Sequence, residues 1–205
     1  MAKFVNLTID GQKVRAHEGQ TILEAAKNRP GIGEIPVLCD NKNVAPYGAC
    51  RICSVEIKHG NHSRLVASCL YPVEEGLDVQ TNSERVLKLR KGIIELLLAR
   101  CPNVEVIKNM AAGLGVTKPR FEAEDSECIL CGLCVRVCAE VTGNKVMSLV
   151  NRGVDREVAA PFYEELPKKC IGCGDCMYIC PTKAIRMGPD NKVILPRPKS
   201  LAAAK

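Results

Sequence analysis

The chain has 205 residues, including 13 cysteines but only 7 aromatic side chains (3 Phe, 4 Tyr and no Trp). This length allows one or two domains of ordinary size. With 46% hydrophobic and 25% charged residues and no long low-complexity run, the composition excludes collagen-like, disordered and coiled-coil proteins. The formal net charge of +6 comes from scattered lysines and arginines without a basic stripe or interleaved aromatics, so we expect no nucleic-acid partner.

The start of the chain alternates apolar and polar residues like a strand and shows no export signal. The longest apolar stretch, residues 92–99, is interrupted by Glu95 and is far shorter than the roughly 20 residues that a membrane-spanning helix needs. We therefore expect a cytoplasmic protein without direct membrane insertion. In that reducing compartment, an odd number of clustered cysteines indicates metal binding or redox chemistry, not disulfides.

Residues 1–80 are predicted to form a mixed sheet of four or five strands crossed by one helix. Asp10 and Gly11 form a tight hairpin signal between the first two strands. The strands are predicted from alternating apolar and polar residues, and the helix from apolar residues at helical spacing. The predicted strands cover residues 4–9, 13–16, 53–58 and 64–68, and the predicted helix covers residues 21–28.

Residues 81–116 are predicted to be a helical connector that begins with a packing helix. Pro102 ends this helix, and a second helix is predicted over residues 104–114. The apolar face of the first helix consists of Leu87, Ile93, Ile94, Leu97 and Leu98, with Arg85, Lys88, Arg90 and Lys91 largely off that face. At the other end of the chain, residues 191–205 carry two prolines and an alanine-rich end, which predicts an extended arm.

The most specific pattern is an internal repeat of cysteines, with the two copies 42 residues apart. The first copy is Cys128-x2-Cys131-x2-Cys134-x3-Cys138, and the second is Cys170-x2-Cys173-x2-Cys176-x3-Cys180, followed by Pro181. This spacing is typical of two 4Fe-4S clusters in which the last cysteine of each copy ligates the cluster of the other copy. We therefore assign one cluster to Cys128, Cys131, Cys134 and Cys180, and the second cluster to Cys138, Cys170, Cys173 and Cys176.

Small and apolar residues between these cysteines also suit cluster binding. Tight turns that bring backbone N–H groups near the sulfurs are expected at Gly132, Gly172 and Gly174. Exclusion of water is expected from Ile129, Ile171 and Ile179. Structural zinc is the alternative, because Cys-x2-Cys pairs also build zinc sites, but those sites use two such pairs and not two runs of three cysteines plus one.

A second constellation, Cys39-x10-Cys50-x2-Cys53-x15-Cys69, places four thiols on a loop, before a predicted strand and at the end of the next strand. Such thiols can meet around a 2Fe-2S cluster, although the spacing differs from the plant-type Cys-x4-Cys-x2-Cys. An oxidised cluster with four thiolates carries a charge of roughly −2, so three clusters cancel about six positive charges. The protein with its clusters is therefore expected to be nearly neutral.

Two segments carry a resemblance to a known family: Ile-Pro-Val-Leu-Cys at residues 35–39 and Tyr-Gly-Ala-Cys-Arg-Ile-Cys-Ser-Val-Glu at residues 47–56. They resemble the N-terminal ferredoxin-like domain of the large iron-sulfur subunit of complex I, of iron-only hydrogenases and of the diaphorase iron-sulfur subunit of NAD-linked nickel-iron hydrogenases. The resemblance continues through residues 87–99 and 134–143. It implies an α+β protein with a β-grasp 2Fe-2S domain over 1–80, a short helical connector over 81–116 and a bacterial-type ferredoxin domain with two 4Fe-4S clusters over 117–190.

The chain departs from this family at one further 4Fe-4S cluster, whose ligands follow a His-x3-Cys-x2-Cys-x5-Cys pattern shortly after the leucine-rich helix. Residues 99–108 contain one cysteine, Cys101, and no histidine. One ligand cannot hold a cubane, so we expect this cluster to be absent and its region to be degenerate. Cys101 is then expected to be a buried free thiol, because free cysteine is among the most buried residue types.

The resemblance implies an iron-sulfur electron-transfer subunit without catalytic residues of its own. Such a subunit relays single electrons between an NAD(P)-linked flavoprotein subunit and another redox module, such as a hydrogenase or formate dehydrogenase, within a hetero-oligomer. Residues 31–33 lack the preceding strand and third glycine of a dinucleotide-binding motif. Two alternatives remain: the iron-sulfur subunit of a succinate or fumarate enzyme, whose 2Fe-2S spacing is more compact, and a redox-sensing or zinc-stabilised interaction module.

Overall fold

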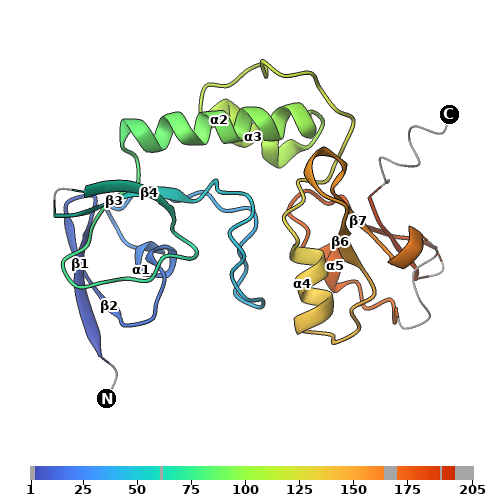
Figure 1. The fold of residues 1–205 in the computed structure, drawn as a ribbon, viewed down its shortest axis with the longest axis horizontal. Helices are drawn as coiled ribbons and strands as arrows, with labels where there is room; N and C mark the ends of the chain where they lie inside the picture. The colour runs from blue at the N-terminus through green and yellow to red at the C-terminus, as the bar shows by residue number, and fades with distance from the viewer. Residues whose placement is uncertain (1–2, 61, 164–169, 190, 197–205) are drawn as a thin grey trace.

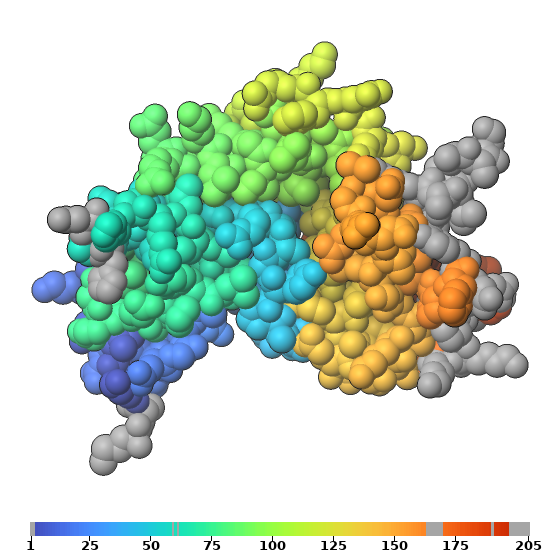
Figure 2. Space-filling model, viewed as in Figure 1, coloured from blue at the N-terminus to red at the C-terminus, as the bar shows by residue number. Residues whose placement is uncertain are grey.

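The computed structural model describes residues 3–60, 62–163, 170–189 and 191–196. Two lobes, one from each end of the chain, lie side by side, and two helices run along one side of both (Figure 1). Between the lobes, a loop of the N-terminal part reaches the C-terminal lobe, and the space-filling view shows the two in contact (Figure 2). Among the described residues, no helix is long and apolar enough to cross a membrane.

The N-terminal lobe is built on a five-stranded sheet with the order β2-β1-β5-β3-β4. The central strand β5 is parallel to its neighbour β1, and every other neighbouring pair is antiparallel. This mixed sheet with one helix on it is the expected β-grasp arrangement, which confirms the predicted fold class. The strands are β1 (Phe4–Ile9), β2 (Gln12–His17), β3 (Ser54–His59), β4 (His62–Ala67) and β5 (Asp78–Gln80).

Local sequence explains the first elements of this lobe. Asp10 and Gly11 connect β1 to β2 with φ angles of 49° and 80°, and a two-residue turn with both φ values positive matches the twist of a hairpin. The short helix α1 (Ile22–Ala26) begins at a capping box formed by Thr21 and Glu24. Its buried side chains join those of the sheet in one core.

The connector consists of α2 (Glu84–Arg100) and α3 (Glu105–Gly113), close to the predicted boundaries. The predicted packing face of α2 is wrong in part. Leu87 is 37% exposed, whereas Arg90 is only 2% exposed. Arg90 is buried because its guanidinium finds hydrogen-bond acceptors: it donates to the carbonyl oxygen of Ser54 at 2.9 Å and to Oδ1 of Asn82 at 3.3 Å. These bonds turn this side of the helix toward β3.

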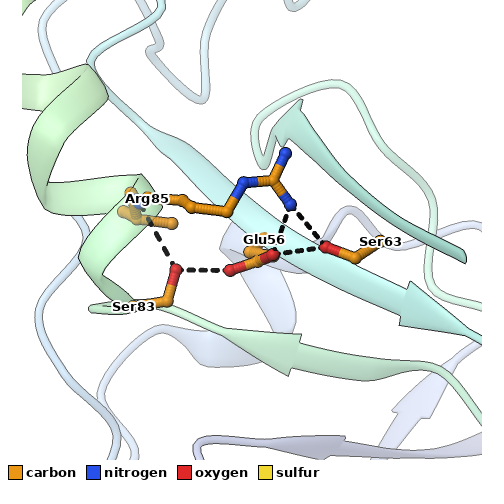
Figure 3. Close-up of polar contacts among 5 residues, drawn as sticks. Glu56, Ser63, Ser83 and Arg85 are labelled. Atoms are coloured by element: carbon orange, nitrogen blue, oxygen red, sulfur yellow. Dashed lines mark hydrogen bonds and ion pairs between the residues drawn. The ribbon is translucent and has the colours of Figure 1, made fainter.

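A buried carboxylate fixes the start of α2 on the sheet (Figure 3). Glu56 on β3 accepts hydrogen bonds from Oγ of Ser83 at 2.5 Å, from the guanidinium of Arg85 at 2.7 Å and from the hydroxyl of Ser63 on β4. Oγ of Ser83 in turn caps α2 by accepting from the backbone N–H of Val86. One side chain therefore joins two strands and the helix N-terminus.

The C-terminal lobe contains short elements around the cysteine repeat. Residues 197–205 of the predicted arm lie outside the described residues, and Val193–Ile194 of its first part pair with Arg186–Met187. A single turn of 3-10 helix, Gly153–Asp155, and a kinked turn, Pro161–Tyr163, flank the strand at 157–159. The helices are α4 (Leu133–Glu140) and α5 (Asp175–Tyr178), and the strands are β6 (Ser148–Val150), β7 (Glu157–Ala159), β8 (Arg186–Met187) and β9 (Val193–Ile194).

Candidate iron-sulfur cluster sites

The first site, called here the 2Fe-2S set, consists of Cys39, Cys50, Cys53 and Cys69. Cys39 and Cys50 lie on the loop between α1 and β3, Cys53 directly precedes β3, and Cys69 follows β4. The sulfurs of Cys53 and Cys69 lie 3.5 Å apart, and the backbone N–H of Cys50 donates to Sγ of Cys39 at 3.4 Å. A tetrahedral metal with metal-sulfur bonds of about 2.3 Å holds two sulfurs about 3.7 Å apart. The separation of Cys53 and Cys69 therefore fits two thiolates on one metal ion.

Neighbouring thiols in the 2Fe-2S set change one another's acidity. Hydrogen bonds from Cys50 and Cys69 lower the pKa of Cys39 to about 2, and a hydrogen bond from Cys69 lowers the pKa of Cys53 to about 6. The pKa values of Cys50 and Cys69 rise, because a thiol that donates is held in its protonated form. Since metals bind thiolates, this arrangement favours two ligands in their binding form, and the other two must release protons.

The second site, the first 4Fe-4S set, surrounds a cavity in the C-terminal lobe. Cys180 from the second copy of the repeat lines this cavity together with three cysteines of the first copy. Apolar side chains such as Ile129, Val158 and Ile185 line the rest of it. The cysteines of the set are Cys128, Cys131, Cys134 and Cys180.

The third site, the second 4Fe-4S set, surrounds another cavity in the same lobe. Here Cys138 from the first copy joins three cysteines of the second copy, and Val146, Met147 and Val193 line the wall. The cysteines of the set are Cys138, Cys170, Cys173 and Cys176. The structure thus brings together the two groups of four thiols that the repeat predicts, and each thiol's role as a ligand stays a prediction.

Burial disfavours the charged thiolate form of the cysteines that line these two cavities. Desolvation raises the pKa of Cys131 to about 12 and of Cys176 to about 11, and it also raises the pKa of Cys128 and Cys134. Thiolates in such apolar surroundings need a positive centre to compensate them. Iron ions of a cluster supply that charge, so donor type, number and surroundings fit 4Fe-4S clusters.

The two copies of the repeat share one backbone path. Gly132 and Gly174 precede α4 and α5 with φ angles of 73° and 79°, and Leu130 and Gly172 occupy equivalent positions with φ angles of 55° and 65°. A Cβ atom on Gly172 would lie 2.5 Å from the carbonyl oxygen of Asn191, so the second copy requires glycine there. The predicted tight turns at all three glycines are therefore present.

Two of the residues predicted to exclude water differ in burial, although each lines its cavity. Ile129 is buried in the first copy, but Ile171 at the equivalent position of the second copy is 71% exposed. Cys173 beside it is exposed as well. The second 4Fe-4S set therefore lies closer to solvent than the first.

Three arginines that the sequence patterns did not indicate donate to backbone carbonyls at or beside predicted ligands. Arg90 donates to Ser54, which follows Cys53. Arg100 donates to Cys128 at 2.7 Å, and Arg136 donates to Cys39 at 2.7 Å. Because clusters with four thiolates are anionic, these cations lie where they offset cluster charge.

Cys101, the one cysteine of the sequence that is assigned to no cluster, lines neither cavity. Its side chain is 0% exposed and packs in a core that includes Val104 and Ile107. Burial raises its pKa to about 12, so it is a thiol at neutral pH. Its assignment as a free thiol stays a prediction.

Comparison with known proteins matches two family models. Residues 2–84 match the 2Fe-2S iron-sulfur cluster binding domain, and residues 127–184 match the 4Fe-4S dicluster domain. These domains suggest one 2Fe-2S cluster and two 4Fe-4S clusters, in agreement with the cofactors predicted from the cysteine patterns.

Similar proteins are subunits of larger oxidoreductases. The NADPH-Fe(3+) oxidoreductase subunit alpha of Geobacter sulfurreducens is 37% identical over 175 residues, which cover 73% of this chain and 20% of that protein. The NADH-ubiquinone oxidoreductase 75 kDa subunit of Reclinomonas americana is 32% identical over 181 residues, 76% of this chain and 26% of the relative. The chain thus spans about a quarter or less of these relatives.

A solved structure of an NAD+-reducing NiFe hydrogenase contains a chain that matches this one with a TM-score of 0.66 and 29% sequence identity, covering 77% of this chain and 75% of that chain. The resemblance stated from the sequence is therefore confirmed. The chain thus contains one region that matches a 2Fe-2S domain and one that matches a 4Fe-4S dicluster domain, and it is similar to subunits of NAD(P)-linked oxidoreductases.

Proposed function

We propose that this chain relays single electrons between an NAD(P)-linked flavoprotein subunit and another redox module, such as a hydrogenase or formate dehydrogenase. Its twelve assigned cysteines hold one 2Fe-2S and two 4Fe-4S clusters, and each cluster supplies one-electron redox chemistry when bound. The observation that carries the proposal is a shared core. Cys39 of the 2Fe-2S set lies in the same buried cluster of side chains as Cys134 and Cys138 of the C-terminal lobe.

The protein's own residues perform three tasks in this relay. The cysteines hold the clusters, and apolar side chains such as Ile129 and Val158 exclude water from the first 4Fe-4S set. Arginines at the ligand carbonyls stabilise added negative charge, which favours uptake of an electron. The exposed Cys173 marks the second 4Fe-4S set as the one best placed to exchange electrons with a partner.

A hydride carries two electrons, which clusters that each take one cannot accept in a single step. A flavin must therefore split the pair, and a partner subunit supplies it. We expect dithionite, but neither NADH nor NADPH, to reduce the clusters of the anaerobically purified chain. Adding the native flavoprotein partner is expected to restore reduction by the pyridine nucleotide.

Absorbance and EPR spectroscopy follow this reduction directly. A preparation without added flavin is the control, because traces of bound flavoprotein would imitate activity of the chain. Rapid reduction of the clusters by NADH in that preparation would overturn the proposal. Zinc in place of iron in the purified protein would instead favour the zinc-stabilised interaction module.

A further inference from the structure

Helix α4, which carries Cys134 and Cys138, also binds the loop that carries Cys39 and Cys50. This loop, residues 39–50, is called here the ligand loop. Arg136, on α4 between those two cysteines, donates one hydrogen bond to the carbonyl oxygen of Cys39 at 2.7 Å. Its other terminal nitrogen donates to the carbonyl oxygen of Ala45. A single side chain of the C-terminal lobe thus binds the ligand loop at two points 6 residues apart.

Further contacts fix the same segment. Glu140, one helical turn after Arg136, accepts a hydrogen bond of 2.7 Å from the backbone N–H of Ala45, so α4 holds both sides of that residue. The Arg136 guanidinium also lies 5.4 Å from the centre of the Tyr47 ring, whose hydroxyl accepts from Arg156 at 3.1 Å. The ligand loop is therefore docked on the C-terminal lobe by charged groups and not by apolar packing alone.

The Nε atom of Arg136 is buried and has no hydrogen-bond partner among the described residues. Leaving a buried donor unpaired is unfavourable, because the N–H loses its hydrogen bonds to water. The side chain therefore accepts an unfavourable environment while its two terminal nitrogens reach the ligand loop. This cost argues for a role tied to the position of the loop.

We propose that Arg136 is a positioning residue: it fixes the ligand loop on α4 and so sets both the separation of the 2Fe-2S set from the first 4Fe-4S set and the electrostatic environment of Cys39. The proposal deepens the electron relay and rests on it. Electron transfer slows steeply with distance, so a loop that moves away from α4 lowers the rate between the two sets. A cation next to the 2Fe-2S set stabilises its reduced, more negative form and raises its midpoint potential.

Three variants test this role. Arg136→Gln removes the charge and the paired donors, whereas Arg136→Lys keeps the charge but not the fork of two nitrogens. The control is Arg15→Gln, which removes an arginine charge on β2, where Arg15 lies over the Phe4 ring. Each protein is purified anaerobically with its clusters. Iron content, midpoint potentials, EPR coupling between the reduced 2Fe-2S and first 4Fe-4S clusters, and amide hydrogen exchange of residues 41–49 are measured.

We expect Arg136→Gln to lower the 2Fe-2S potential, weaken the EPR coupling and speed amide exchange in the ligand loop about 10-fold or more, as the loss of charged hydrogen bonds implies. The potential of the second 4Fe-4S cluster should shift less than that of the 2Fe-2S cluster, because Arg136 binds the ligand loop directly. Arg136→Lys should recover the potential but not the coupling or the protection from exchange. Arg15→Gln should match the unmodified protein in every measurement.

Unchanged exchange and coupling in an iron-replete Arg136→Gln protein would overturn the proposal. Equal shifts in all three clusters would also overturn it, because a positioning role acts on one pair. If Arg136→Gln loses iron, Arg136→Lys decides by the same exchange and coupling measurements. These readouts need no partner subunit, so they can support the positioning role even where the flavoprotein test contradicts the electron relay.

Discussion

Nε of Arg100 donates a hydrogen bond of 2.7 Å to the carbonyl oxygen of Cys128. The same guanidinium forms an ion pair of 3.3 Å with Glu124. Arg100 is the last residue of α2, and Cys128 begins the first copy of the cysteine repeat. The connector helix is therefore tied to the first 4Fe-4S set through a charged hydrogen bond.

Replacing Arg100 by Gln is expected to destabilise the protein by about 1.5–3 kcal/mol, the range for hydrogen bonds to charged groups, because its side chain is only 17% exposed. The loss of positive charge should also lower the midpoint potential of the first 4Fe-4S cluster. Thermal unfolding and redox titration of the holoprotein measure these effects. Arg186→Gln is the control, since its pair with Glu127 is exposed and worth about 0–1 kcal/mol. Equal losses in both variants would contradict the assigned role of Arg100.

Metal content tests the three assigned sets together. Anaerobically purified protein is expected to contain about ten irons and as many acid-labile sulfides per chain, from one 2Fe-2S and two 4Fe-4S clusters. Iron and sulfide assays on the same sample measure both. About fourteen irons per chain after reconstitution would show that the chain also binds a third 4Fe-4S cluster, because each such cluster holds four irons.

Cys101 and Cys176 form a matched pair of cysteine substitutions. Cys101→Ala is expected to leave iron content and reduced-state EPR spectra unchanged, because Cys101 is a buried thiol that lines neither cavity, and to cost about 1 kcal/mol of stability. Cys176→Ser should impair one 4Fe-4S cluster, because a serine oxygen is a poorer iron ligand than a thiolate. Loss of a cluster signal in the Cys101 variant would contradict its assignment.

Cysteine spacing was sufficient to predict which thiols meet around the two cavities. The glycines before α4 and α5 made the repeat more specific, because glycine adopts the positive φ angles that the backbone has there. Pro181 after the last cysteine added to that specificity. The hairpin at Asp10 and Gly11 was predictable for the same reason, because its two turn residues are adjacent in the sequence. Such features are predictable since they depend on residues that are close in the sequence.

Contacts between distant residues were not predictable in this way. Arg136 reaches Cys39 across 97 positions, and Arg90 is buried because Ser54 offers it a carbonyl, so neither follows from a periodic pattern. The short strand β5 was not among the predicted strands, because three residues carry too little alternation to detect. Ile171 is exposed although Ile129 is buried, since the two copies of the repeat meet different surroundings.

Glu56 is expected to stabilise the joint between the sheet and α2 in a pH-dependent manner. Hydrogen bonds from Ser63 and Ser83, together with Arg85, lower its pKa below the usual 4.5. A lowered carboxyl pKa contributes stability that is complete above the unfolded pKa and is lost as the pH falls through the folded pKa. The stabilisation should therefore be constant near neutral pH and shrink only below about pH 4.5.

Glu56→Gln is expected to lower the free energy of unfolding by about 1.5–3 kcal/mol, because a neutral amide replaces a charged acceptor with three donors around it. Denaturant unfolding of the unmodified protein and Glu56→Gln between about pH 6 and pH 8 should give the same difference in free energy of unfolding throughout, since Glu56 is ionised in the folded and the unfolded chain over that range.

Ser83→Ala is the companion variant. It removes the N-cap of α2 and one donor to Glu56, so a loss of about 1 kcal/mol is expected, and its effect should be less than additive with Glu56→Gln because the two groups share a hydrogen bond. A difference between the unmodified protein and Glu56→Gln that declines from pH 8 to pH 6 would show that a group other than this carboxylate controls the stability of the joint.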